Sequence, residues 1–571
     1  MNVWIHLALI ASILFPSDTV YVDVKQGTLR GKVVDFVEDK YANVSTKINV
    51  FQGIPYGEKP VRWRPPEMKK RWKGVRDATN FNFSCPQYVV PGQELSSTPL
   101  TMSEDCLLLN VYAPHETDEN VPVMVFIHGG AFIEGTSMTY DFSGVPLAAI
   151  GNVVIVTINY RVGALGFLST GDEAARGNFG LLDQALALQW VQDNIHAFGG
   201  DKTKVTIFGE SAGAASVDLQ VISKYSRDLF AQAISESGVA SALWAISEEF
   251  ENNKVNYSFR LGNQVNCATS NTTELVECLR KIDAVYLEMV SAKMSLTQDH
   301  PIRMGPTIDG VFLNGYPRAF LERGDFKDCP MIIGFNKDEG TFEVLQEMPS
   351  YYYSTEPPYI NKADLNSILL KSLKIIYGSD NVEYEIEQEV LQQYVNLSYS
   401  DQEVHDYFET IVQIYGDAGF NCPSILTARA HANMTSLPVY MYYMTHAPKS
   451  SYFIINRTGP GWLGAGHGED LPFVFGYPFI PELKGSRGQM TEEEAKLSVN
   501  FMHFWTNFAK TGDPSRKDLI SPPGVGGMEW PAFTERELQY KKMSVELPVG
   551  RALKVKKCAF WDRIERTAQG V

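Results

Sequence analysis

The stretch that decides the fold reads Val205-Thr206-Ile207-Phe208-Gly209-Glu210-Ser211-Ala212-Gly213. Its first four residues form an apolar run typical of a buried strand, and residues 212–222 are compatible with a helix. The pattern Gly-x-Ser-x-Gly between them predicts a sharp turn, in which small residues let two backbones approach closely. Such a turn exposes the Ser211 hydroxyl where the start of a helix favours developing negative charge. Because the pattern also occurs by chance, its position between strand and helix gives it weight.

Further apolar runs predict other strands. They occupy residues 123–127, 153–158, 331–334 and 439–443. Residues 183–198 carry Leu186, Trp190 and Ile195 at roughly helical spacing. Strands that alternate with helices predict an α/β fold with a parallel or mixed sheet covered on both faces. Because no repeat, low-complexity tract or Pro/Gly-rich linker divides the chain, we expect residues 20–571 to form one domain with helical insertions.

The composition is that of a folded, acidic protein. Of the 571 residues, 44% are hydrophobic and 12% aromatic, which suffices for a large core. The formal net charge of -17 argues against a nucleic-acid partner, because phosphate binding requires a concentrated basic face.

The N-terminus predicts entry into the secretory pathway. Residues 3–15 are apolar except for His6, and small or polar residues follow at Ser17 and Thr19. This run is too short to span a bilayer and is typical of a signal peptide, which we expect to occupy residues 1–19. No second apolar run is long enough to cross a membrane, so the sequence predicts a secreted, soluble protein.

Seven cysteines fit an oxidising compartment if six of them pair. Their spacing offers one hypothesis, with two short loops and one long-range pair: Cys85 with Cys106, Cys267 with Cys278, and Cys422 with Cys558. This leaves Cys329 as a buried, inert thiol. No cluster of Cys and His predicts a metal site.

Seven Asn-x-Ser/Thr triplets are candidate glycosylation sites, namely Asn43, Asn82, Asn256, Asn271, Asn396, Asn433 and Asn456.

A second motif, His128-Gly129-Gly130-Ala131-Phe132, follows the apolar run that ends at residue 127. The glycine pair lets backbone N–H groups point into open space, as an oxyanion hole requires. We expect the N–H groups of Gly130, Ala131 and Ala212 to form that hole. The alternative is a glycine-rich turn with no catalytic role.

A serine nucleophile needs a histidine base and an orienting acid. If chain order follows Ser, acid, His, the base is one of six histidines after Ser211: His300, His405, His431, His446, His467 and His503. Glycines at 464, 466 and 468 place His467 in a loop that can carry an imidazole to a site, whereas His503 lies in a helical pattern. The acid is expected soon after the run 331–334, but local sequence does not separate Asp338 from Glu339.

Taken together, these motifs resemble the type-B carboxylesterase and cholinesterase family. The likeness spans nearly the whole chain and includes residues 51–56, 103–107, 128–132, 159–161, 209–213 and 337–340, with His467-Gly468. The resemblance implies an α/β-hydrolase fold with a large, mostly parallel mixed sheet, flanked by helices and carrying helical insertions. It also implies Glu339 as the acid, His467 as the base and the disulfides given above. Glu210 matches the carboxylate beside the nucleophile, and Phe342 matches an aromatic residue of the substrate gorge.

Two departures bear on the substrate. Choline-ester enzymes of the family carry a tryptophan in the loop closed by the first disulfide, but none lies between Cys85 and Cys106. We therefore expect a carboxylesterase-like protein rather than a true acetylcholinesterase. Ala131 stands where the family often has glycine, and its Cβ restricts the backbone on the alcohol side of the site.

The sequence thus predicts a secreted serine hydrolase that acts on small to medium apolar esters through an acyl-enzyme, without a cofactor or metal. A choline-ester or hormone-ester specialist is an alternative within the enzymes. From another class, a neuroligin-like adhesion protein shares the fold without chemistry. Such relatives usually lack the nucleophile and have a membrane span, whereas this chain keeps Ser211, Glu339 and His467.

Overall fold

A computed structural model describes most of the chain. The described residues are 19–89, 101–116, 120–247, 253–296, 304–377, 384–395, 405–449, 451–452, 461–484, 490–515 and 529–568. The expected signal peptide therefore lies outside the described residues, except that Thr19 is the first residue of the first strand. Asn396 and Asn456, two of the candidate glycosylation sites, also lie outside them, and the four sequon residues Asn43, Asn82, Asn271 and Asn433 are exposed.

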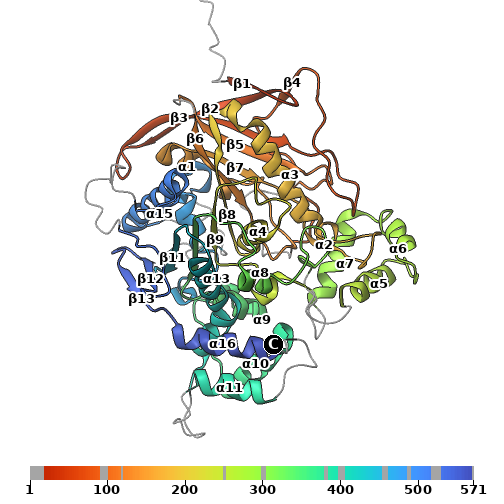
Figure 1. Cartoon of the computed structure of the whole chain (residues 1–571), viewed down its shortest axis with the longest axis vertical. Helices are drawn as coiled ribbons and strands as arrows, with labels where there is room; N and C mark the ends of the chain where they lie inside the picture. Colours follow the sequence, from red (N-terminus) through yellow and green to blue (C-terminus); the bar gives the residue numbers. More distant parts are fainter. Residues whose placement is uncertain are drawn as a thin grey trace, which may run out of the picture.

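The described strands form one sheet of 13 strands (Figure 1). Its order is β1-β2-β3-β5-β7-β6-β8-β9-β10-β11-β12-β13, and β4 pairs with β2. From β7 to β12 all neighbours are parallel, and both ends of the sheet are antiparallel. The bounds are β1 Thr19–Val24, β2 Gly27–Glu38, β3 Val44–Pro55, β4 Val75–Asp77, β5 Leu108–Pro114, β6 Val121–Ile127, β7 Val154–Ile158, β8 Gly200–Glu210, β9 Gln232–Glu236, β10 Met331–Asn336, β11 Val439–Met444, β12 Gln539–Met543 and β13 Val549–Arg551.

Each apolar run named above lies within a central strand, apart from residue 153, which directly precedes β7. These strands are buried on both faces, which is why their residues are continuously apolar instead of alternating. The helical spacing at residues 183–198 corresponds to α3 (Phe179–Asn194) and the 3-10 turn that follows it. The mixed, mostly parallel sheet flanked by helices confirms the predicted α/β-hydrolase fold.

Two hydrophobic clusters lie on opposite faces of the sheet. Along β6, Val123 and Val125 belong to one cluster, whereas Met124 and Phe126 belong to the other, as the alternation of side chains on a strand requires. The first cluster contains residues of α3 and of α4 (Ala212–Ile222), and the second contains residues of α1 (Val145–Gly151) and α15 (Glu492–Thr511). In Figure 1, α1 and α15 accordingly lie on the side of the sheet away from α3.

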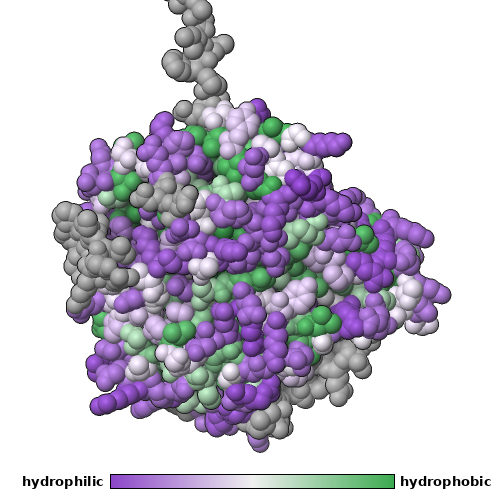
Figure 2. All heavy atoms as spheres, turned by 45° about the horizontal axis from the view of Figure 1, so that its top comes forward, coloured by the Kyte–Doolittle hydropathy of each residue, from purple (hydrophilic) through white to green (hydrophobic). Residues whose placement is uncertain are grey.

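The remaining helices cover the ends of the strands and form the insertions. Three of them, α5, α6 and α7, lie together at one side of the molecule (Figure 1). The bounds are α2 Gly163–Phe167, α5 Asn253–Gln264, α6 Thr272–Leu279, α7 Ala284–Leu296, α8 Pro317–Arg323, α9 Thr341–Glu347, α10 Lys362–Tyr377, α11 Tyr384–Tyr394, α12 Phe408–Gly416, α13 Cys422–Met434, α14 Leu471–Val474 and α16 Val555–Ala568. Hydrophilic side chains cover much of the face shown in Figure 2, with hydrophobic ones between them.

Three disulfides link segments that are separate in the sequence. They join Cys85 to Cys106, Cys267 to Cys278, and Cys422 to Cys558, which are the pairs expected above. The third attaches the C-terminal helix α16 to the start of α13. Cys329 is a free, buried thiol, and burial raises its pKa to about 12, so it is a poor nucleophile at neutral pH.

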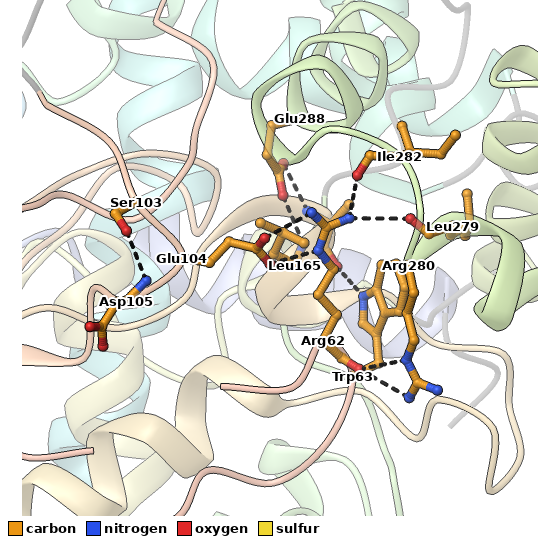
Figure 3. Close-up of polar contacts among 11 residues, drawn as sticks. Arg62, Trp63, Ser103, Glu104, Asp105, Leu165, Leu279, Arg280, Ile282 and Glu288 are labelled. Carbon is orange, nitrogen blue, oxygen red and sulfur yellow. Dashed lines mark hydrogen bonds and ion pairs between the residues drawn. The ribbon is translucent and has the colours of Figure 1, made fainter. Parts of the chain in front are cut away.

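A polar joint connects the inserted helices to the core (Figure 3). Arg62 forms a two-point ion pair with Glu104, at 2.6 and 2.9 Å, and also donates to the carbonyl groups of Leu279 and Ile282. From α7, the carboxylate of Glu288 accepts hydrogen bonds from the second and third backbone N–H groups of α2, those of Ala164 and Leu165, at 3.0 and 2.7 Å. Because the N–H of Gly163 donates to the Phe132 carbonyl, this joint also holds the loop that follows β6.

Gly163 is expected to tolerate no side chain. It has φ +59°, and a Cβ there would lie 2.0 Å from Glu288 Oε2. We predict that Gly163→Ala lowers the melting temperature much more than Gly74→Ala, because Gly74 also has positive φ but nothing within 4 Å of its Cβ position. The backbone penalty, about 1 kcal/mol, is common to both variants, and the collision adds about 1–3 kcal/mol. Equal melting temperatures for the two variants would contradict this prediction.

Candidate functional site

The turn between β8 and α4 is tight because two glycines meet the neighbouring strand. A Cβ at Gly213 would lie 2.0 Å from the Ile127 carbonyl oxygen, and one at Gly209 would lie 2.6 Å from the same atom. Between them, Ser211 has φ 59° and ψ -125°, a conformation that is unusual for a residue other than glycine. Its N–H donates to the Glu236 carbonyl at 2.9 Å, and its own carbonyl accepts from Ala215. The serine is therefore held in a strained turn, half exposed, at the start of α4.

The glycine-rich loop after β6 lies against this turn. A Cβ at Gly129 would lie 3.1 Å from Ser211 Cβ, so only glycine fits between the two segments. The next three residues, Gly130, Ala131 and Phe132, all have positive φ, at 105°, 51° and 63°. The Gly130 carbonyl accepts from the N–H groups of residues 133 and 134, which closes the loop. Ala131 thus adopts a left-handed conformation despite its Cβ.

Glu339 and His467 meet in a buried hydrogen bond. Glu339 follows β10 by three residues, and its Oε2 lies 2.6 Å from His467 Nδ1. Its other oxygen, Oε1, accepts from Ser237 Oγ at 2.5 Å and from the Asn336 N–H at 2.6 Å. Neither Glu339 nor Ser237 is exposed to solvent. With Nδ1 occupied by this carboxylate, Nε2 is the ring nitrogen on the other edge of the imidazole.

Asp338, the other candidate acid, has a different partner. Its carboxylate accepts from the Ala465 N–H at 2.9 Å, and its own N–H donates to the Ala465 carbonyl at 2.8 Å. Gly464 also packs against it, because a Cβ there would lie 2.2 Å from Asp338 Oδ2. Asp338 therefore anchors the glycine-containing loop that carries His467, whereas Glu339 contacts the imidazole itself.

Glu210, which precedes the serine, contacts the second ring nitrogen of the imidazole. Its Oε1 lies 3.2 Å from His467 Nε2, and both side chains are buried. Burial raises the pKa of Glu210 to about 8, although the imidazole opposes this rise. Burial lowers the pKa of His467, but Glu210 and Glu339 outweigh it and raise this pKa to about 9. An ionised Glu210 is the largest influence that favours the imidazolium, so protonation of Glu210 lowers the pKa of His467 and favours the neutral ring, which can accept a proton.

Two aromatic rings pack on the imidazole. The ring of Phe342, in α9, lies 5.4 Å from that of His467, centroid to centroid, and the ring of Phe420 lies 4.5 Å away. Phe420 belongs to the π-helical turn Asp417–Asn421 between α12 and α13, a kind of turn that is frequent at functional sites. The imidazole therefore packs against two aromatic rings.

Sequence reasoning missed Ser237 and Phe420. Ser237 directly follows β9 and has φ 54°, so its position at the carboxyl end of a parallel strand, beside β8 and β10, was the available signal. The sequence around Phe420 contains no pattern that predicts its place beside the histidine, because that place depends on the π-helical turn. Of the predicted residues, His467 contacts both Glu339 and Glu210, Gly129 packs against Glu210 and Ser211, and the ring of Phe342 packs on the imidazole.

The described residues contain no group of three or more His, Cys, Asp or Glu side chains arranged to hold a metal ion. The arrangement instead offers a hydroxyl in a strained turn, a buried imidazole with an oriented Nε2, and a glycine-rich loop against the hydroxyl. These are the parts that nucleophilic catalysis of acyl transfer requires.

In the portion of the chain that is described, no helix is both apolar and long enough to cross a membrane.

Comparison with known proteins agrees with this geometry. A model described as the carboxylesterase family matches residues 18–561. A medium-chain fatty acyl-CoA hydrolase precursor from Anas platyrhynchos is 36% identical over 552 residues, which are 94% of this chain and 91% of the relative. Neuroligin-2 from Mus musculus is 34% identical over 560 residues, and neuroligin-2 from Homo sapiens is 33% identical. The alignment covers 90% of this chain but only 64% of the length of either neuroligin-2.

The contact between Glu210 and His467 makes a prediction about the imidazole. Removing the carboxylate in Glu210→Gln should lower the pKa of His467 by about one pH unit or more, because an opposite charge in contact favours the protonated ring. The measurement is an NMR titration of the chain with 13C-labelled histidine, in which the His467 signal is assigned from its loss in His467→Gln. Glu210→Asp, which keeps a carboxylate, is the control. An unchanged or higher pKa in Glu210→Gln would show that Glu210 does not stabilise the imidazolium.

Proposed function

This chain belongs to the carboxylesterase family, and we propose that it is a secreted serine hydrolase that cleaves carboxylic esters through an acyl-enzyme on Ser211. One observation carries the proposal: the buried 2.6 Å contact between Glu339 and His467, whose Nε2 lies 3.2 Å from Glu210, the residue directly before Ser211. An imidazole fixed in this way is a base for a neighbouring hydroxyl.

In the first half of the proposed cycle, Ser211 Oγ attacks the ester carbonyl while His467 Nε2 takes its proton. The carbonyl oxygen becomes an oxyanion held by the N–H groups of Gly130, Ala131 and Ala212. Each such donor typically contributes about 3 kcal/mol to lowering the barrier. The imidazolium then gives its proton to the leaving alcohol, and the acyl group stays on Ser211.

In the second half, water repeats the sequence. His467 takes a proton from water, the hydroxide attacks the acyl carbonyl, and the proton returns to Ser211 Oγ as the carboxylic acid leaves. Glu339 keeps Nδ1 protonated and stabilises the imidazolium, supported by its bonds from Ser237 and Asn336. No cofactor enters these steps.

We propose small to medium apolar esters as substrates. The aromatic wall formed by Phe342 and Phe420 supports an apolar acyl or alcohol group. The name of the duck relative, a medium-chain fatty acyl-CoA hydrolase, supports acyl transfer to water as the reaction class. Secretion is supported by the three disulfides and by the exposed sequon residues.

A binding role without catalysis is the second candidate, and the likeness to neuroligin-2 favours it. The two candidates differ in what Ser211 does. A binding protein does not need a serine in a strained turn beside a buried Glu-His pair, whereas a hydrolase does. Covalent labelling by a fluorophosphonate probe separates them, since only an activated serine reacts.

The central test of the proposed function is Ser211→Ala. We expect this variant to lose nearly all hydrolysis of 4-nitrophenyl butyrate, at least about 1000-fold in kcat/KM, because the proposed acyl-enzyme forms on this hydroxyl. The exposed Ser270→Ala is the control and should keep wild-type activity. Circular dichroism and the melting temperature should not change. Substantial activity in Ser211→Ala would reject the assignment.

Ser237→Ala tests the support for the acid. Loss of the hydroxyl removes one of two protein donors to Glu339 Oε1, and a hydrogen bond to a charged group contributes about 1.5–3 kcal/mol. We expect kcat for 4-nitrophenyl butyrate to fall by roughly tenfold or more, with little change in KM, because the imidazolium is less well stabilised. A higher KM with an unchanged kcat would contradict this expectation and would indicate that Ser237 acts in substrate binding.

A further inference from the structure

Glu134 is an acidic residue that the proposed cycle does not use. It lies in the loop after β6, four residues beyond Gly130, and the loop brings it back against that glycine. A Cβ at Gly130 would lie 2.2 Å from the Glu134 carbonyl oxygen and 3.2 Å from its Cγ. The Glu134 side chain therefore runs along the segment that supplies two of the proposed oxyanion donors.

This side chain lies close to the reactive serine. The Cβ position of Gly129 is 3.1 Å from Ser211 Cβ, and the Cβ position of Gly130 is 3.2 Å from Glu134 Cγ. Because neighbouring Cα atoms are about 3.8 Å apart, Glu134 Cγ lies within about 13 Å of Ser211 Cβ. An ester bound at Ser211 can therefore place a second functional group beside Glu134.

The Glu134 carboxylate has no protein partner in the described residues. No hydrogen bond or ion pair reaches it there, and burial, which raises its pKa to about 7, is the one influence on its titration. It nevertheless keeps partial contact with solvent, as do Gly129, Gly130, Ala131 and Ser211, whereas β6 and the end of β8 are fully buried. A carboxylate that only held the loop together would have a donor, so this one is available to a ligand.

The surroundings of Glu134 favour a positive ligand. Glu210 borders the same glycine pair, with Oε2 3.0 Å from the Cβ position of Gly129. In the described part of the chain, no Lys or Arg forms an ion pair with either carboxylate, and the net charge of the whole chain is -17. Because Glu210 already pairs with His467, the Glu134 carboxylate, which has no partner among the described residues, is the one that attracts a cation into the site.

We propose that Glu134 is a specificity-determining residue that binds a hydrogen-bond-donating cation, a primary or secondary ammonium or a guanidinium, carried by the ester substrate. The proposal rests on the esterase function proposed above and narrows its substrate class to esters with an apolar body and a basic group. A carboxylate prefers such cations to a quaternary ammonium because it accepts their N–H bonds. Holding a quaternary ammonium mainly requires an aromatic face, and no Trp lies between Cys85 and Cys106.

The test measures binding rather than turnover, so that it does not depend on hydrolysis. The probes are 1-naphthylmethylammonium, its uncharged counterpart 1-naphthylmethanol, and the quaternary 1-naphthylmethyltrimethylammonium. Their affinities for the full chain are measured by isothermal titration calorimetry at constant ionic strength. The variants are Glu134→Gln and Glu134→Ala, with Asp39→Asn as a control that removes one exposed charge elsewhere.

We expect the wild-type chain to bind the primary ammonium about tenfold or more tightly than the alcohol, as one charged hydrogen bond allows. Both Glu134 variants should lose most of this preference while their affinity for 1-naphthylmethanol stays the same, and Asp39→Asn should keep it. The trimethylammonium probe should bind more weakly than the primary ammonium. Equal binding of ammonium and alcohol, a preference that persists in both Glu134 variants, or tighter binding of the quaternary probe would overturn the proposal.

Failure of the esterase function is distinguishable from failure of this proposal. In Ser211→Ala the ammonium preference should persist, because Glu134 does not need the hydroxyl. A chain that shows the preference but no hydrolysis would contradict the proposed function alone, whereas hydrolysis without the preference would contradict the role of Glu134.

Discussion

The hydrogen bond between Glu339 and His467 is the interaction on which the site depends. It joins two residues 128 positions apart and fixes both the tautomer and the direction of the imidazole. The acid can serve this purpose because two donors from different strand ends, Ser237 Oγ and the Asn336 N–H, occupy its second oxygen. The loop that carries the histidine is held independently through Asp338 and Ala465. Two adjacent acids thus have distinct tasks, one toward the loop and one toward the ring.

Close backbone approach is the second constraint. At Gly213, Gly209 and Gly129 an added Cβ would meet backbone or the nucleophile itself at 3.1 Å or less. The parallel pairing of β6 with β8 brings these glycines together, since Ile127 is the partner of Gly209 in the register. The fold therefore positions the loop of residues 129–132, which carries two of the proposed oxyanion donors, against the serine turn before any substrate arrives, as electrostatic preorganisation requires.

Much of this arrangement could be predicted from the sequence, because it is encoded locally. The apolar run before Gly209, the helix after Ser211 and the glycine pair at Gly129 are features of short segments, and each has its physical reason within a few residues. The short segment around Asp338 and Glu339 does not show which of the two acids orients the histidine, because both occupy one turn after β10. Their roles differ only through contacts with the distant His467 loop: Asp338 binds its backbone, and Glu339 binds the imidazole. Ser237 and Phe420 were missed for the same reason: one depends on the convergence of strand ends, the other on a π-turn. The lack of a donor to the Glu134 carboxylate among the described residues likewise depends on the three-dimensional packing of the loop, which local sequence does not encode.

The most direct measurement is the location of the acyl group during turnover. The chain is mixed with 4-nitrophenyl butyrate, quenched in acid within the first turnover, digested with trypsin and analysed by mass spectrometry. Residues 205–224 lie between two lysines and form one tryptic peptide that contains Ser211. A butyryl group on Ser211, lost when His467 is replaced by alanine, is the result we expect. A butyryl group on another residue, or none during active hydrolysis, would contradict the convergence of Ser211, His467 and Glu339 in one catalytic site.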